Sequence, residues 1–418
     1  MQRRVFVVGG SITPFIGKGH PDFIWKKHAD FGKKENPTTE ELLTKATLDA
    51  LNSTGVAAEA IDSMAVGNFT GELFVKQGHL GAALVGAHPG LMNKPSMRVE
   101  GACASGALAV NSVYKNILAG EDVVLAAGVE VQTTVSAREG GDYLARASHY
   151  RRQRSIDDFT FPALFARRMK AISAAGHFTM EDTARVVAKA YANGNKNPLA
   201  HMTKAKMPFE VASEASPKNP CFLGNEEFKD YLRMSDCSQV SDGASALILA
   251  SEEGLKKLGK KPEDCVEIIG LGQATGNLYE DAPDATKMST SGAASRKALE
   301  LAGVSAKDLQ VAEVHDCFSI AELLMYEALG IADYGEAKTL IREGATNLDG
   351  RIPVNTGGGL ISFGHPVGAT GIKQVMEVYR QMKGQCGDYQ MAKIPALGAC
   401  LNMGGDDKTA VCTVLKNL

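Results

Sequence analysis

The chain lacks an excess of charge of either sign. Its 418 residues include 45 Lys and Arg and 48 Asp and Glu, for a net charge of −3 at pH 7. Nucleic-acid-binding proteins usually carry a basic surplus, so this near balance argues against that class of partner. No run of apolar residues is long enough to span a membrane either. At this length the chain exceeds one ordinary domain.

Cysteine pairs with metal-binding or redox spacing are also missing. The eight cysteines lie far apart, with no Cys-x-x-Cys pair, and no neighbouring ligand pair accompanies His315 and Cys317. We therefore predict neither a disulfide framework nor a metal site. This cysteine usage favours a reducing intracellular compartment. We expect the cytoplasm or mitochondrial matrix rather than the peroxisome, because the chain does not end in Ser-Lys-Leu.

What the chain does contain is an internal repeat. The stretch from Ala50 to Phe69 matches the stretch from Ala298 to Cys317 at a constant offset of 248 residues, without a gap. Both copies read as a helix end, a glycine-containing turn and a buried strand. A period this long indicates a duplicated domain, because the units of solenoid proteins are far shorter.

Each half is predicted to have the order β-α-β-α-β-α-β-β, a mixed α/β sheet with helices on both faces. We divide the chain into an N-terminal half at 1–130, completed by 235–255, and a C-terminal half at 256–418. The segment 131–234 has no counterpart in the other half. We interpret it as an inserted loop domain that contacts substrate and supports oligomerisation.

Three short segments place reactive side chains among small residues: Gly101-Ala-Cys-Ala-Ser-Gly106, His315-Asp-Cys-Phe318 and Gly364-His-Pro-Val-Gly-Ala-Thr-Gly371. Buried cysteines and histidines are common singly, but two thiols and two imidazoles together indicate acyl transfer through a thioester. Cys103 is the predicted nucleophile and His365 its base. Because Cys103 directly precedes a predicted helix, we expect the helix N-terminus to lower its pKa.

These segments resemble the thiolases, and within them the sterol-carrier-protein type, over essentially the whole chain. Val99 to Gly106 resembles the nucleophile loop and Gly364 to Gly371 the histidine motif, while His315 to Phe318 replaces the Asn-Glu-Ala-Phe of the common thiolases. The resemblance implies a five-layer α-β-α-β-α fold and a homodimer or homotetramer. It also implies no permanently bound cofactor, and reversible exchange of 3-ketoacyl-CoA plus CoA for a shortened acyl-CoA plus acetyl-CoA.

The resemblance suggests roles for further residues. Cys317 is the expected acid/base at the substrate α-carbon. Cys400 occupies the position of the common thiolases' C-terminal cysteine, but Asn402 interrupts that motif. Two interpretations of Cys400 therefore stay open: an alternative acid/base, or a small buried thiol without a catalytic role. We expect His315 and His365 together to donate to the thioester oxygen and stabilise the enolate. An amide from the turn containing Asn402 and Gly404 is expected to stabilise the tetrahedral intermediate.

A local basic run in the insertion suggests where the phosphates of coenzyme A bind. Arg167, Arg168 and Lys170 are the candidates. A basic run is more often only a solvated face, so no single residue is singled out.

Two alternatives to a thiolase stay open. One is another condensing enzyme of the same fold, resembling HMG-CoA synthases or ketoacyl synthases, and the other is a catalytically silent acyl- or lipid-binding homologue. Condensing enzymes of the first kind do not need a second thiol, so the presence of Cys317 argues against them. The complete set of Cys103, His315, Cys317 and His365 argues against the second.

Overall fold

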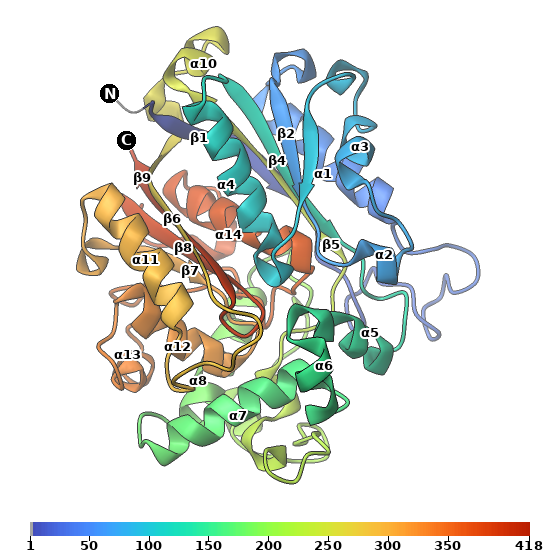
Figure 1. Ribbon diagram of the computed structural model, residues 1–418, viewed down its shortest axis with the longest axis vertical. Helices are drawn as coiled ribbons and strands as arrows, with labels where there is room; N and C mark the ends of the chain where they lie inside the picture. Colours follow the sequence, from blue (N-terminus) through green and yellow to red (C-terminus); the bar gives the residue numbers. More distant parts are fainter. Residues whose placement is uncertain (1–2) are drawn as a thin grey trace.

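The computed structural model describes residues 3–418 (Figure 1). Nine strands form one mixed sheet in the order β3-β2-β4-β5-β1-β6-β9-β8-β7. The strands are β1 (Val5–Ile12), β2 (Ser63–Gly67), β3 (Ser96–Val99), β4 (Val123–Glu130), β5 (Gly243–Ser251), β6 (Val266–Thr275), β7 (Val311–Val314), β8 (Leu397–Gly404) and β9 (Thr409–Asn417).

The order of the strands is symmetrical about the centre of the sheet. The two halves meet where β1 and β6 pair antiparallel, Phe6 opposite Glu267 and Val7 opposite Val266. Reading outwards, β1, β5, β4 and β2 correspond to β6, β9, β8 and β7. Among these eight strands, β2–β4 and β7–β8 are parallel and the other pairs are antiparallel. This arrangement confirms the predicted duplication.

The third strand of the second half is the one departure from this symmetry. The first half has β3 at its edge, but its counterpart is reduced to a single parallel bridge between Ala312 and Val354. Pro353 has no backbone N–H to donate, and Asn355 has a positive φ of 56° that turns the chain away. These two residues limit the pairing to that one bridge.

Helices cover both faces of the sheet and also lie between its halves. They are α1 (Thr39–Thr54), α2 (Gly71–Phe74), α3 (Leu80–Val85), α4 (Ser105–Leu118), α5 (Ala137–Leu144), α6 (Tyr150–Gln153), α7 (Thr160–Ala174), α8 (Met180–Gly194), α9 (Phe209–Ala212), α10 (Glu252–Lys257), α11 (Ser289–Ala302), α12 (Ser319–Leu329), α13 (Ala337–Arg342) and α14 (Val367–Met382). No helix in residues 3–418 is long and apolar enough to cross a membrane.

The helices at repeat-related positions define the layers. Helix α1 packs on β1, β4 and β5, and α11 packs on β6, β8 and β9, so these two helices form the outer layers. Helices α4 and α14 pack against each other and contact strands of both sheet halves. Helix α14 is buried along nearly its whole length, as a central layer requires. The result is the expected α-β-α-β-α arrangement.

Matching local signals end the two outer helices. Gly55 caps α1 with φ 66° and Gly303 caps α11 with φ 65°, the left-handed conformation that glycine adopts at low cost. These glycines are equivalent positions of the internal repeat. A glycine in the left-handed conformation thus begins the same helix-to-strand connection in both halves.

The segment between β4 and β5 forms the lower part of the molecule in Figure 1. It contains α5 to α9, and α7 and α8 pack against α12 of the second half. A buried ion pair joins the two parts, since Lys189 Nζ on α8 lies 2.5 Å from a carboxylate oxygen of Glu322 on α12. The insertion therefore sits over the ends of the strands that carry the reactive segments.

Candidate active site

Cys103 is presented by a constrained turn between β3 and α4. The residue before it, Ala102, has a positive φ of 52°, which costs a non-glycine residue on the order of 1–3 kcal/mol. The Glu100 carboxylate accepts the Ala102 N–H at 2.6 Å, and the Ser105 hydroxyl accepts the Gly101 N–H at 3.0 Å. These bonds hold the turn, so the Cys103 side chain is fixed at the start of α4.

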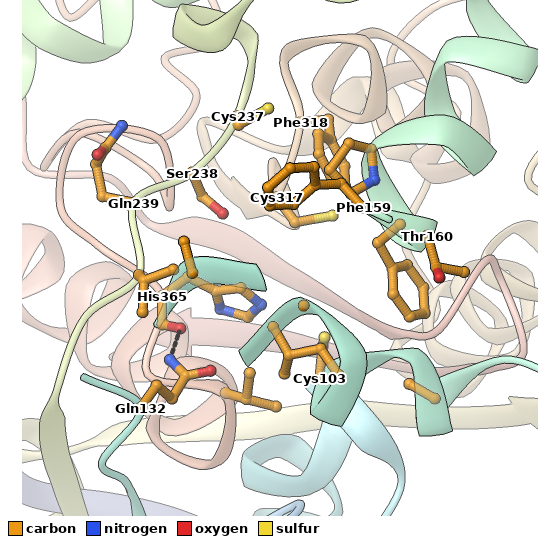
Figure 2. Close-up of a pocket in the computed structure, with 18 of the residues that line it drawn as sticks. Cys103, Gln132, Phe159, Thr160, Cys237, Ser238, Gln239, Cys317, Phe318 and His365 are labelled. Atoms are coloured by element: carbon orange, nitrogen blue, oxygen red, sulfur yellow. Dashed lines mark hydrogen bonds between the residues drawn. The ribbon is translucent and has the colours of Figure 1, made fainter. Parts of the chain in front are cut away.

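His365 lies two residues before the start of α14 and is held through its backbone. The Gln132 side-chain amide donates to the His365 carbonyl at 2.9 Å, as Figure 2 shows. The Ser241 hydroxyl accepts the His365 N–H at 3.3 Å. Two segments far from His365 in the sequence thus hold its backbone.

Glycines let the two helix starts approach closely enough for Cys103 and His365 to meet. A side chain on Gly106 of α4 would lie 2.6 Å from the carbonyl oxygen of Gly368, and one on Gly371 of α14 would lie 2.2 Å from the Ala107 nitrogen. Only glycine permits such backbone contact. The duplication therefore brings its two reactive helix starts together at the centre of the molecule.

The reactive atoms of Cys103, His315 and His365 lie within 4.8 Å of one another. The two imidazole rings have centroids 5.1 Å apart and are nearly perpendicular. Cys317, which follows β7, lines the same cavity as Cys103 and His365, and Figure 2 shows the three side chains facing that cavity. The structure thus brings all four predicted reactive residues to one place.

Hydrogen bonds assign opposite tautomers to the two histidines. The Thr370 hydroxyl donates to the Pro366 carbonyl, so its lone pair accepts the Nδ1–H of His365 at 2.6 Å. The Nε2 of His365 is then unprotonated. The Asn402 side-chain amide donates to Nδ1 of His315 at 2.9 Å, which leaves the proton of His315 on Nε2.

Both Nε2 atoms are buried and have no hydrogen-bond partner among residues 3–418. Each imidazole has a ring nitrogen within 4.8 Å of the Cys103 sulfur. Since both Nδ1 atoms already have partners, the Nε2 atoms are the ones available to a bound substrate. His365 offers a base and His315 a hydrogen-bond donor. Sequence reasoning missed Thr370, although it lies inside the Gly364–Gly371 motif, and it had no signal for Gln132.

The expected lowering of the Cys103 pKa is wrong. Burial raises the pKa of the Cys103 thiol to about 12, against the backbone N–H of Gly405, which donates to the sulfur. Burial also lowers the pKa of His365 to about 3, and burial next to His365 lowers the pKa of His315 well below its usual value. The resting site is thus a neutral thiol beside two neutral imidazoles, because desolvation outweighs the helix N-terminus.

The expected turn containing Asn402 and Gly404 also needs correction. Strand β8 continues to Gly404, and the turn begins at Gly405, whose φ is 66°. The amide beside Cys103 is therefore that of Gly405. Asn402 faces His315 with its side chain, and Gly404 lets β8 pass the nucleophile loop, since a Cβ there would lie 2.0 Å from the Gly101 carbonyl oxygen.

Cys400 lies away from the cavity. Its thiol is buried between β8 and α14 and donates to the Gln374 carbonyl at 3.3 Å. Burial and the nearby Glu313 raise its pKa well above the usual value. This environment is that of a buried thiol.

The basic candidates in the insertion do not line the cavity, and all three have acidic partners. Arg168 is fully buried, with its Nε 2.5 Å from Asp406 and further bonds to backbone carbonyls. Arg167 lies 3.4 Å from Asp281, and Lys170 lies 2.9 Å from Glu227. Arg168 is thus part of the core and cannot bind a phosphate, which removes it as a candidate.

The cavity has a volume of about 340 Å³ and is mainly apolar. Its lining residues are Phe69, Cys103, Gln132, Ala137, Gly141, Leu144, Ala147, Phe159, Thr160, Phe161, Pro162, Phe222, Met234, Cys237, Ser238, Gln239, Val240, Cys317, Phe318, His365, Val367 and Gly405. No Asp, Glu, Lys or Arg is among them. Cavities of this size and character bind small organic molecules.

The only group of His, Cys, Asp and Glu residues in 3–418 close enough to share a metal ion is Cys103, His315 and His365. Zinc accepts these ligand types. The absence of a bound metal stays a prediction.

A mixed α/β fold with a cysteine nucleophile and two histidines defines a class of acyl-transferring enzymes. The family model "Thiolase, N-terminal domain" matches residues 26–253, and "Thiolase C-terminal domain-like" matches residues 272–417. The chain belongs to the thiolase family. With the His-Asp-Cys-Phe block it is a thiolase of the sterol-carrier-protein type, and thus an acyltransferase.

Individual relatives agree with this assignment. The chain is 35% identical over 382 residues to the acetyl-CoA acetyltransferase of Methanothermobacter thermautotrophicus, covering 91% of this chain and 95% of that protein. It is 30% identical over 419 residues to sterol carrier protein 2 of Homo sapiens, covering 96% of this chain and 70% of that protein. Among solved structures, the Ltp2-ChsH2(DUF35) aldolase matches with a TM-score of 0.78 at 19% identity, over 99% of this chain and 97% of that chain. This match shows a shared fold.

Proposed function

We propose that this thiolase cleaves 3-ketoacyl-CoA with coenzyme A, and makes the reverse condensation, through an acyl group carried on Cys103. The proposal rests on one observation: the Cys103 sulfur and the free Nε2 atoms of two oppositely protonated histidines share one buried site. In the first step the sulfur attacks the 3-keto carbon while its proton passes to Nε2 of His365. Because thiol and imidazole are both neutral at rest, proton transfer accompanies the attack.

Breaking the carbon–carbon bond leaves the enolate of acetyl-CoA. Burial raises the pKa of the Cys317 thiol well above its usual value, so this thiol is protonated and can donate to the α-carbon. The Nε2–H of His315 is oriented to stabilise the enolate oxygen. The backbone amides of Cys103 and Gly405 are suited to the oxyanion of the tetrahedral intermediate.

The second half-reaction restores the enzyme. The sulfur of coenzyme A attacks the acyl carbon on Cys103, and its proton goes to the Cys317 thiolate. His365 returns its proton to the departing Cys103 sulfur. The net change is one 3-ketoacyl-CoA and one coenzyme A converted to one acetyl-CoA and one shortened acyl-CoA.

The polar side of the cavity suits the amide-bearing arm of coenzyme A. Ser238 and Gln239 lie there, on the segment that leads into β5, opposite Phe159 and Phe318 in Figure 2. The pantetheine arm carries two amides that need such partners. Arg167 and Lys170, at the surface of α7, remain candidates for the phosphates if their acidic partners release them.

Strand β3 suggests how two copies associate. It lies at the edge of the sheet, where its one partner within residues 3–418 is β2, and Met97 on it is 49% exposed. An unpaired edge with an exposed apolar side chain favours pairing with another strand. We propose a homodimer formed through β3, in a reducing compartment such as the cytoplasm, where eight free thiols persist.

The test of the reaction is the covalent intermediate. After incubation with acetyl-CoA, intact-mass spectrometry should find one acetyl group on the wild-type chain and none on Cys103→Ala. Peptide mapping should place the adduct on Cys103. An adduct on another cysteine, or thiolysis of acetoacetyl-CoA that survives in Cys103→Ala, would contradict the proposal.

A further inference from the structure

The wall of the cavity opposite the catalytic residues comes from the insertion and is aromatic. Phe159 and Phe161 lie at the start of α7, and Phe222 lies in the loop that follows α9. Phe159 and Phe222 pack edge to face, with ring centroids 5.5 Å apart. This wall is therefore a packed surface rather than a set of separate side chains.

Phe318 extends the same wall from the catalytic side. It directly follows Cys317, and its ring stacks at 4.5 Å on Phe165, which is fully buried. Packing from behind fixes Phe318 at the cavity. The apolar surface thus begins next to the residues that hold the acyl group and continues across the insertion.

Polar groups that would suit a hydrophilic acyl group are absent from this wall. Thr160, which lies between Phe159 and Phe161 in the sequence, donates its hydroxyl to the Arg154 carbonyl at 3.4 Å. The Gln132 amide is used by the carbonyls of Ser241 and His365. No lining residue in the described chain carries a charge, so a carboxylate on the acyl group would be buried without a partner.

We infer that the acyl group transferred by Cys103 is bulky, apolar and uncharged, an aryl or medium-chain alkyl group rather than acetyl. This inference rests on the proposed function, because it assigns the acyl side of the same reaction. With the coenzyme A arm on the polar side of the cavity, an acetyl group on Cys103 would leave the phenylalanine wall without contacts. A larger apolar group gains contact along Phe159, Phe161 and Phe318.

The test compares the thiolysis of four substrates. The rate of acetyl-CoA release is measured for each. The substrates are acetoacetyl-CoA, 3-oxooctanoyl-CoA, 3-oxo-3-phenylpropanoyl-CoA and the carboxylate-bearing 3-oxoadipyl-CoA. One methylene in an apolar pocket changes kcat/KM by about 10- to 200-fold. We expect at least one of the two apolar substrates to exceed acetoacetyl-CoA by about tenfold or more, and 3-oxoadipyl-CoA to be the poorest of the larger three.

Gly141 offers a way to fill the cavity without disturbing the catalytic residues. It lies on α5, and a Cβ there would be 3.5 Å from Phe159, an ordinary contact. Gly141→Leu should therefore lower kcat/KM for the larger apolar substrates about tenfold more than for acetoacetyl-CoA. Arg138→Leu, whose side chain is 71% exposed on the same helix, is the matched control and should leave all ratios unchanged.

The outcomes separate this inference from the proposed function. If acetoacetyl-CoA is the best substrate, or 3-oxoadipyl-CoA equals 3-oxooctanoyl-CoA, the inference is wrong while acetylation of Cys103 still supports a thiolase. If Gly141→Leu changes all substrates equally, the acyl group does not occupy this cavity. If no substrate acylates Cys103, the proposed function itself fails.

Discussion

Thr370→Val tests whether the hydroxyl of Thr370 sets the tautomer of His365. Valine has nearly the shape of threonine but offers no acceptor for the Nδ1–H of His365, which now lies 2.6 Å from the hydroxyl oxygen. The imidazole would then keep a buried N–H without a partner or move the proton to Nε2. In the second case Nε2 can no longer accept the proton of Cys103.

The size of the effect follows from the buried hydrogen bond. Leaving a buried donor without its partner costs about 1–3 kcal/mol. At about 1.4 kcal/mol per factor of ten, acylation of Cys103 should slow by roughly 5- to 150-fold. KM for the acyl-CoA should change little, because Thr370 does not line the cavity.

The assay is a single-turnover measurement of Cys103 acetylation by acetyl-CoA, quenched at intervals and read by intact mass. Thr370→Ser keeps the hydroxyl and is the matched control, so its rate should stay near that of wild type. The thermal unfolding midpoints of the variants show whether any loss comes from unfolding. Equal acetylation rates in wild type and Thr370→Val would refute the tautomer assignment, as would equal losses in the Ser and Val variants.

Three further predictions follow from the site and the sheet. Cys317→Ala should still acquire an acetyl group on Cys103, but it should exchange the methyl protons of acetyl-CoA with deuterated water about 100- to 10,000-fold more slowly than wild type. Cys400→Ala should exchange these protons nearly as fast as wild type. The reverse pattern would reassign the acid/base to Cys400. Because the pKa of Cys103 is raised to about 12, its thiolate fraction grows with pH, so alkylation by iodoacetamide should rise roughly tenfold per pH unit from pH 7 to 10. A plateau near neutral pH would mean a resting thiolate. Met97→Lys should weaken the dimer, and wild-type light scattering that returned 44.3 kDa at micromolar concentration would count against a dimer altogether.

The repeat made much of the fold predictable from the sequence. Apolar spacing and turn glycines act locally, so the match of Gly55 with Gly303 correctly indicated equivalent helix ends. The helix predicted to follow Cys103 is also present, as α4. The missing third strand at Val354 was not foreseen, because its loss depends on how Pro353 and Asn355 direct the chain.

Long-range contacts account for the corrections at the site. The basic run at Arg167 to Lys170 looked free in the sequence, but Arg168 pairs with Asp406, which lies 238 positions away. Cys103 looked like a thiolate at a helix start, but burial raises its pKa to about 12. Neither burial nor a distant partner leaves a mark on the sequence around the residue.

The sequence by itself determined which reactive groups the chain carries, because each reactive cysteine or histidine and its small neighbours lie in one short continuous segment. Only the tertiary structure decided their protonation states. The proton on each imidazole depends on its partner at Nδ1, and for His315 that partner is Asn402, which lies 87 positions away. Hydrogen bonds and desolvation act between residues that are distant in the sequence. The roles of His365 as a base and His315 as a hydrogen-bond donor therefore arise only once β7, β8 and α14 have packed together.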